Sequence, residues 1–187
     1  MSPTEIQLSE QIWNNLKIAI IIIAALAPII IVFLIIRYKR IIKNLKKDQQ
    51  KNQKIFEKRI EIYERIGPKL NDLLCFYSYT GNWKELTPFD ILRLKKELDK
   101  EINIHAPLFS KDLGKKYLDF MHVCFVSYSG WEHKEKIKSL YEIRRDNMAV
   151  WIDEWIPFFD TKNVVEAILL KERYDELIAC FKRDLNP

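Results

Sequence analysis

The alternation of apolar and polar residues divides the chain into a uniformly apolar run, a basic helix and a series of amphipathic helices. Residues 18–36 read IAIIIIAALAPIIIVFLII, with ten isoleucines in nineteen positions and no charged or polar side chain. A helix rises about 1.5 Å per residue and the apolar core of a bilayer is about 30 Å thick, so this length just spans a membrane. We therefore predict a transmembrane helix at 18–36, preceded by a short external tail at 1–17.

Two alternative interpretations fit the apolar run less well. The A-L-A tripeptide at 25–27 has the form of a signal-peptidase site, but eight apolar residues follow Pro28, and Glu5 and Glu10 precede the run. A buried helix of a globular protein would have a polar face, which this run lacks. Pro28 removes a backbone donor, so we expect a kink in the helix there.

The charges that flank the run predict its orientation, because cytoplasmic flanks carry the excess of lysine and arginine. Lys17 precedes the run, whereas residues 37–54 hold eight basic residues and a single acidic one, Asp48. The N-terminus is therefore expected outside and the C-terminal part in the cytoplasm, in the inner membrane of a bacterial-type cell. The predicted membrane-surface residues are Arg37, Lys39, Arg40, Lys43, Lys46 and Lys47.

The formal net charge of +5 comes from this basic segment. Residues 55–187 hold 22 lysines and arginines against 23 aspartates and glutamates, which leaves a net charge of −1. A basic cluster next to a membrane span is attracted by anionic lipid headgroups. The predicted partners therefore include the lipid bilayer and its anionic headgroups, and nucleic acid is not expected.

Residues 37–66 contain no glycine or proline and predict a basic stalk helix that continues from the membrane span. Apolar positions recur three or four residues apart, but Asp48, Asn52 and Arg59 interrupt the series. A solvated helix whose last turns dock on the following domain fits better than a coiled coil, although Asn52 leaves a homo-oligomer open. Gly67 and Pro68 are expected to end this helix.

Residues 67–187 predict a cytosolic bundle of helices, so the fold class is all-α. Glycines and prolines mark the ends of helices, and two-residue hairpin turns are absent. Thr87 and Ser110 are expected to cap the helices that follow them. The predicted helices cover about 68–79, 88–105, 111–128, 132–156 and 161–181, with a loop at 80–82.

Residues able to carry chemistry do not form a recognisable motif. Cys75, Cys124 and Cys180 each lie in an apolar helical stripe without a C-x-x-C pair, and are expected to be core thiols. The chain has three histidines and too few glycines for a phosphate-binding loop, so we expect no metal and no cofactor. Lys100 precedes His105 at a spacing like that of HEPN-type helical ribonucleases, but those nucleases have arginine at the first position.

Aromatic and arginine side chains supply the remaining candidates. Tryptophan, tyrosine and arginine dominate the energetics of interfaces, although aromatic side chains also fill cores. The candidate partner-binding residues are Trp83, Arg144, Arg145, Trp151 and Trp155.

Together, these patterns predict a non-enzymatic single-pass membrane protein whose cytosolic helical domain binds a protein or a small ligand. A membrane-permeabilising effector of a bacterial defence or toxin system is the alternative. An unrecognised helical nuclease is a third hypothesis.

Overall fold

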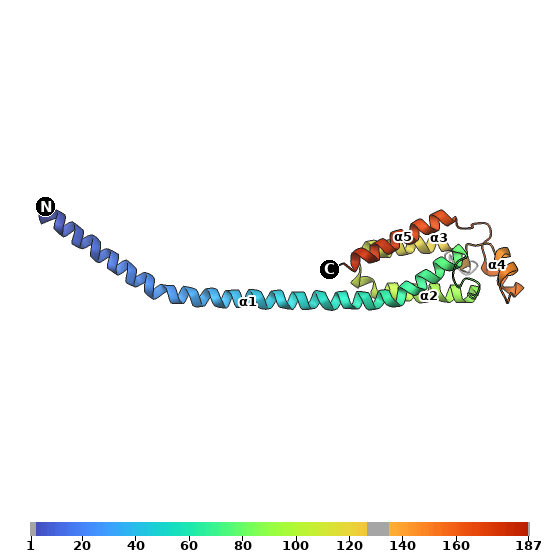
Figure 1. Ribbon diagram of the computed structural model, residues 1–187, viewed down its shortest axis with the longest axis horizontal. Coiled ribbons are helices and arrows are strands. Elements are labelled where there is room, and N and C mark those ends of the chain that lie inside the picture. Colours follow the sequence, from blue (N-terminus) through green and yellow to red (C-terminus); the bar gives the residue numbers. More distant parts are fainter. Residues whose placement is uncertain (1–2, 127–134, 187) are drawn as a thin grey trace. The chain divides into compact units, whose positions relative to one another are not determined.

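The computed structural model describes the backbone of residues 3–126 and 135–186, and the side chains of this part except those of residues 3–12, 19 and 22–30. The described chain is mostly helical, which confirms the all-α class (Figure 1). The helices are α1 (Pro3–Ser78), α2 (Pro88–His105), α3 (Lys111–Cys124), α4 (Glu142–Asn147) and α5 (Ala167–Asp184), with 3-10 turns η1 (Ala106–Leu108) and η2 (Asp153–Phe158).

The chain forms two compact units, residues 1–53 (unit 1) and residues 54–187 (unit 2). Unit 1 consists of the first part of α1, and unit 2 begins with the rest of this helix. Within the described part, no helix is both long enough and apolar enough to cross a membrane. Residues 19 and 22–30 of the predicted span, and with them the predicted kink at Pro28, lie outside the described side chains.

The prediction that Gly67 and Pro68 end a helix is wrong, because α1 continues without a break to Ser78. Packing explains the continuation: Ile66 and Leu70, on either side of the Gly-Pro pair, are both completely buried in the core of unit 2. Burial of the apolar face thus stabilises the helix by more than the loss of the backbone hydrogen bond that proline removes destabilises it. Figure 1 shows the last turns of α1 inclined to the turns before them, as expected near an internal proline.

The loop after α1 and the start of α2 agree with the sequence prediction. Gly81 adopts a positive φ of 58°, which glycine tolerates without strain. The Thr87 hydroxyl accepts a hydrogen bond from the backbone N–H of Asp90, whose carboxylate accepts one from the backbone N–H of Thr87. This reciprocal cap fixes the first turn of α2, and Pro88 follows at the first helical position.

Helix α3 begins as predicted but ends earlier. The Ser110 hydroxyl accepts from the backbone N–H of Leu113, whereas the helix stops at Cys124 instead of near residue 128. Strand β1 (Phe125–Val126) follows at once and pairs antiparallel with β2 (Lys136–Ile137), in a register that joins Phe125 to Ile137. The predicted end at Ser129 and Gly130 falls outside the described residues.

The predicted helix at 132–156 is wrong. Of its described part, Ile137 lies in β2 and pairs with Phe125 on one side and with Phe159 on the other, in an isolated parallel bridge. The backbone N–H of Asp160 also donates to the carbonyl oxygen of Ile137 at 2.8 Å. These extended pairings exclude a helix at that point, and in residues 135–158, which the structure describes, only the short helices α4 and η2 form.

The last helix starts later than predicted, at Ala167 instead of near Thr161. The backbone N–H of Val165 donates to the carbonyl oxygen of Lys138 at 3.2 Å, so this segment joins the extended pairing next to β2. Apolar residues at 164 and 165 therefore belong to an extended connection and not to the helix.

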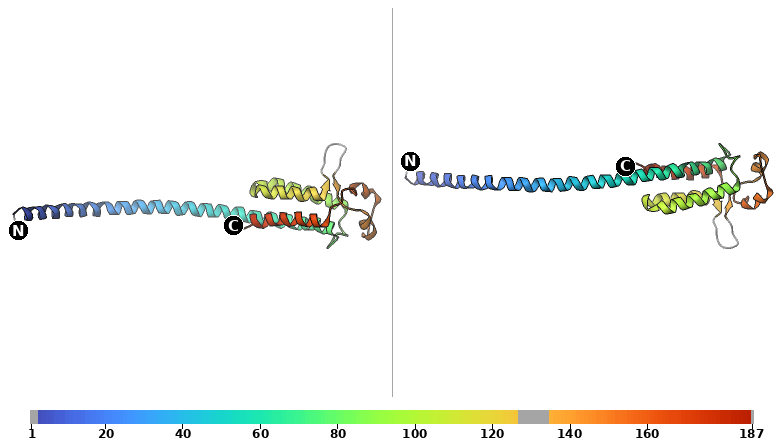
Figure 2. Two further views of the ribbon diagram at one scale, coloured as in Figure 1. Left: turned by 90° about the horizontal axis from the view of Figure 1, so that it is seen from above. Right: turned by 90° about the horizontal axis from the view of Figure 1, so that it is seen from below.

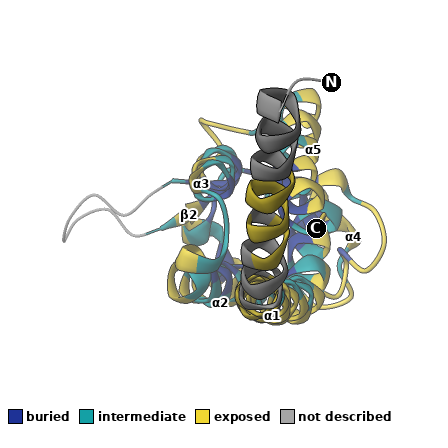
Figure 3. Cartoon of the chain, turned by 90° about the vertical axis from the view of Figure 1, so that its left-hand side faces the viewer, coloured by how far each residue is buried: buried dark blue, intermediate teal, exposed yellow. Residues whose placement is uncertain are grey.

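The core of unit 2 lies between the end of α1 and helices α2, α3 and α5. Figure 3 shows the buried residues on the facing sides of α2, α3 and α5. The largest completely buried apolar side chains are phenylalanines, and they come from α1, α3, β1 and α5: Phe76, Phe120, Phe125 and Phe181. Figure 2 shows α4 and the segment 148–158 together at one end of this unit.

Candidate functional site

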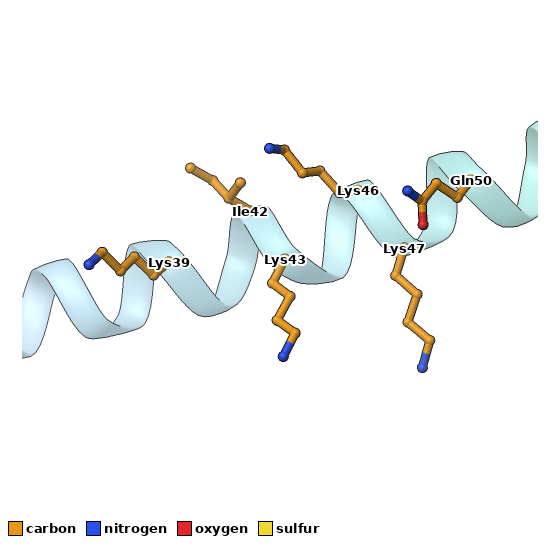
Figure 4. Close-up of a pocket in the computed structure, with 6 residues that line it drawn as sticks. All are labelled: Lys39, Ile42, Lys43, Lys46, Lys47 and Gln50. Carbon is orange, nitrogen blue, oxygen red and sulfur yellow. The ribbon is translucent and has the colours of Figure 1, made fainter.

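The basic segment of α1, residues 37–54, is exposed along nearly its whole length. Figure 4 shows Lys43 and Lys47 projecting from one side of the helix, with Ile42 and Lys46 on the other. A shallow open hollow lies along this helix surface, lined by Lys39, Ile42, Lys43, Lys46, Lys47 and Gln50. Its lining is rich in positive charge and comes from a single helix, so it suits a surface contact more than an enclosed ligand.

The predicted partner-binding residue Arg144 is not at the surface but is completely buried, with an exposed fraction of 0%. Its guanidinium carbon lies 3.3 Å from the centroid of the Phe76 ring and 4.8 Å from that of Tyr79. Nη2 donates to the carbonyl oxygen of Phe76 at 2.7 Å, and to the hydroxyl oxygen of Ser139 at 3.3 Å. Arg144 therefore caps the C-terminal end of α1, where helix carbonyls lack partners.

The positive charge of Arg144 has no counter-ion among the described residues, and its Nε and Nη1 atoms are buried without a hydrogen-bond partner. Burial lowers the pKa of Arg144 from the ordinary value of arginine to about 10, although two nearby tyrosines oppose this. The side chain is therefore still charged at neutral pH. The aromatic rings around it supply the attraction that a carboxylate would otherwise provide.

The structure brings Trp83 and Arg144 together, since their ring centroid and guanidinium carbon are 5.7 Å apart. Trp83 is also buried and packs edge-on against Tyr79 at 5.2 Å. These two residues hold the loop after α1 and helix α4 onto the end of α1. They serve the packing of unit 2, and neither offers a surface to a partner.

A second aromatic cluster holds the remaining candidates. Trp151 packs edge-on against Trp155, with centroids 5.5 Å apart, and stacks on Tyr141 at 6.2 Å. The guanidinium carbon of Arg145 lies 6.0 Å from the Tyr141 ring, and its side chain is about half exposed. Trp155 is buried, whereas Trp151 is partly exposed.

Apolar side chains that the sequence did not single out surround this cluster. Val150 and Ile152 flank Trp151 and are exposed, as is Ile143 on α4. Phe89, at the start of α2, is also exposed and packs on Phe158 with centroids 4.8 Å apart. We call this set the aromatic end of unit 2: Phe89, Ile143, Arg145, Val150, Trp151, Ile152 and Phe158.

A charged network joins α2, α3 and the start of the 135–140 segment. The ammonium of Lys95 donates to carboxylate oxygens of Asp99 at 2.7 Å and of Glu135 at 2.9 Å, and the Tyr117 hydroxyl donates to Asp99 at 2.6 Å. Burial alone would lower the pKa of Lys95, but the two carboxylates outweigh it and raise the pKa. Every charge in this network is paired, so its arrangement is typical of structural support.

Cys124, Cys180 and His105 lie in surroundings that the structure describes. Burial raises the pKa of the Cys124 thiol, and burial with the nearby Asp112 carboxylate raises that of Cys180, so both resist ionisation. His105 ends α2, with its Nε2 atom 3.4 Å from the Glu101 carboxylate. Among the described residues, no three histidine, cysteine or acidic side chains are grouped closely enough to hold a metal ion.

Comparison with known proteins gives no family. No protein-family model matches the chain, and neither a curated protein nor a solved structure is significantly similar to it.

Proposed function

We propose that this chain is a single-pass protein of a bacterial-type inner membrane, whose cytosolic unit 2 binds a protein partner. Residues 18–36 form the span, residues 1–17 lie outside, and the basic segment follows on the cytoplasmic side. The observation that carries the proposal is the apolar run bounded by a strong basic excess on one side only.

The exposure of apolar side chains in unit 1 supports the span. Ile18, Ile20 and Ile21 are each more than half exposed, and the six residues 31–36 are each about half exposed or more. A continuous apolar surface around a helix is unfavourable in water and favourable in hydrocarbon. A lipid environment therefore satisfies side chains for which unit 1 itself supplies no apolar cover.

The aromatic end of unit 2 is the surface proposed to bind the partner. It combines exposed apolar side chains with Trp151 and with Arg145 at the edge, which is the composition of interface centres in proteins. The pair Trp83 and Arg144 fixes the segment behind this surface, so the surface is held in one conformation before binding.

Topology is tested with two reporter fusions after Pro187. A phosphatase that is active only outside the cytoplasm should be inactive there, and a green fluorescent protein should fluoresce. The membrane fraction should retain the chain after alkaline carbonate extraction. An active phosphatase, or release of the chain by carbonate, would contradict the proposal.

A permeabilising effector is the second candidate function. One feature of the span's composition, its small residues, favours it. Small residues allow helices to approach closely in lipid, and beside Ala19 the small residues of an otherwise bulky run are grouped at Ala24, Ala25 and Ala27. Exchange of residues 18–36 for an unrelated span of equal length and orientation discriminates between an anchor and an effector. An anchor should retain function after the exchange, whereas an effector should lose the ability to depolarise the membrane.

A further inference from the structure

The basic segment of α1 has two different faces just beyond the predicted span. Successive residues of an α-helix are rotated by about 100°, which places Tyr38, Ile41, Ile42 and Leu45 within an arc of about 100°. Tyr38, Ile41 and Leu45 are each about half exposed or more, so unit 1 gives this arc no apolar cover. The arc ends with Leu45, because Gln49 and Asn52 occupy the same face in the next turns.

The basic residues occupy the rest of the circumference. Arg40, Lys43 and Lys47 lie opposite the apolar arc, and Figure 4 shows Lys43 and Lys47 directed away from Ile42. Arg37 and Lys46 flank the arc, each about 40° from its nearest apolar residue. Long basic side chains at the edges of an apolar face are placed to reach phosphates while the apolar face contacts acyl chains.

We propose that residues 37–47 bind the anionic phospholipids of the cytoplasmic leaflet, with Tyr38 and Ile41 at the acyl boundary and the flanking cations on the headgroup phosphates. This inference rests on the proposed membrane span and specifies the lipid class that the protein prefers. A modest tilt of the helix toward its apolar arc keeps Tyr38 and Ile41 within the headgroup layer, which is only about 5 to 8 Å thick on each side.

A second copy of the same helix is the competing occupant of the apolar arc, and charge disfavours it. Residues 37–54 carry eight basic residues against Asp48, so two parallel copies would bring segments of +7 together with almost no acid to pair them. The same charges are attracted by an anionic leaflet, by a factor of about five in affinity for each cation that reaches it. Charge complementarity therefore favours anionic lipid over a second copy of the helix as the occupant of the apolar arc.

The test uses the full chain at one copy per nanodisc, in discs of phosphatidylcholine alone and in discs with about one third phosphatidylglycerol. Limited trypsin digestion, read by mass spectrometry, compares cleavage after Lys46 and Lys47 with cleavage after Lys54. Lys54 lies about 27 Å along the helix from Ile36, well beyond the Debye length of about 8 Å. It is therefore an internal standard.

We expect cleavage after Lys46 and Lys47 to slow by about fivefold in anionic discs, and this protection to disappear at molar salt. Tyr38→Gln with Ile41→Gln should remove most of the protection, whereas Asn52→Gln, on the same helix face beyond the apolar part, should not.

Equal cleavage in both kinds of disc would overturn the lipid preference and leave the span untouched. Protection that requires two copies in one disc would also overturn it, because a second copy would then be the occupant. Failure of the chain to stay in discs, with release by carbonate from cells, would refute the proposed span itself.

Discussion

Arg144 provides the sharpest test of how unit 2 is held together, because its charge is buried without a counter-ion. Its replacement by methionine keeps most of the volume and removes the charge, whereas Arg144→Ala also leaves a cavity. Lowering the pKa of arginine from its ordinary value to about 10 corresponds to about 3 kcal/mol of cost for holding the charge inside.

The interactions of the guanidinium oppose this cost. The charged hydrogen bond to the Phe76 carbonyl oxygen is worth about 1.5 to 3 kcal/mol, and the contact with the aromatic rings about 2 kcal/mol. Loss and gain nearly cancel, so Arg144→Met should change the free energy of unfolding by no more than about 2 kcal/mol. Arg144→Ala adds a cavity term and should cost a further 2 to 4 kcal/mol, roughly.

Urea unfolding of the purified chain, followed by tryptophan fluorescence, measures both variants, since Trp83 and Trp155 are buried in unit 2. The matched control is Arg145→Met, because Arg145 is the neighbouring arginine and is about half exposed. It should change the free energy of unfolding by less than about 0.5 kcal/mol. The unfolded chain holds the arginine proton up to the ordinary pKa of arginine and the folded chain only up to about 10, so this group makes stability rise with pH only above about 10. The free energy of unfolding measured at about pH 7 to 8 is therefore unaffected by the titration of Arg144. If Arg144→Met destabilised unit 2 as much as Arg144→Ala, the charge would be a net source of stability and the reasoning would be refuted.

Three further predictions concern local hydrogen bonds of unit 2. Thr87→Ala removes the cap of α2 and should cost about 1 kcal/mol in urea unfolding, whereas Thr87→Ser should cost much less. Tyr77→Phe removes one of two donors to the buried carbonyl oxygen of Cys124, which still accepts from the backbone N–H of Lys138, and should cost about 1 kcal/mol by the same assay. The Asn163 amide, with nearby backbone N–H groups, lowers the pKa of Asp160 from 3.8, so the folded state binds fewer protons than the unfolded state. Stability should therefore fall as pH drops below this value, and Asp160→Asn should flatten that part of a stability–pH curve.

Local signals in the sequence predicted the parts of the fold that depend on local contacts. Thr87, Pro88 and Asp90 fix the start of α2 among themselves, so the cap needs no information from elsewhere in the chain. Ser110 acts in the same way for α3. The all-α class followed from the helical spacing of apolar residues and the shortage of turn glycines.

The errors arose where contacts distant in sequence decide the local structure. Ile137 and Trp155 fit a helical stripe, yet Ile137 is held extended by Phe125 and Phe159, twelve and twenty-two residues away. Proline at 68 normally ends a helix, but the burial of Ile66 and Leu70 against other helices carries α1 past it. Neither pairing nor packing of this kind is visible in the periodicity of one segment.

The candidate site was predicted by residue type alone, and type does not separate an interface from a core. Trp83 and Arg144 have the chemistry of binding hot spots, but burial against Phe76 and Tyr79 assigns both to the interior of unit 2. Residues that the sequence passed over, such as Val150, are instead exposed beside Trp151. The surface proposed to bind a partner therefore depends on how Arg144 holds α4 against α1, and we expect a variant that loosens this contact to weaken the proposed binding without touching the partner.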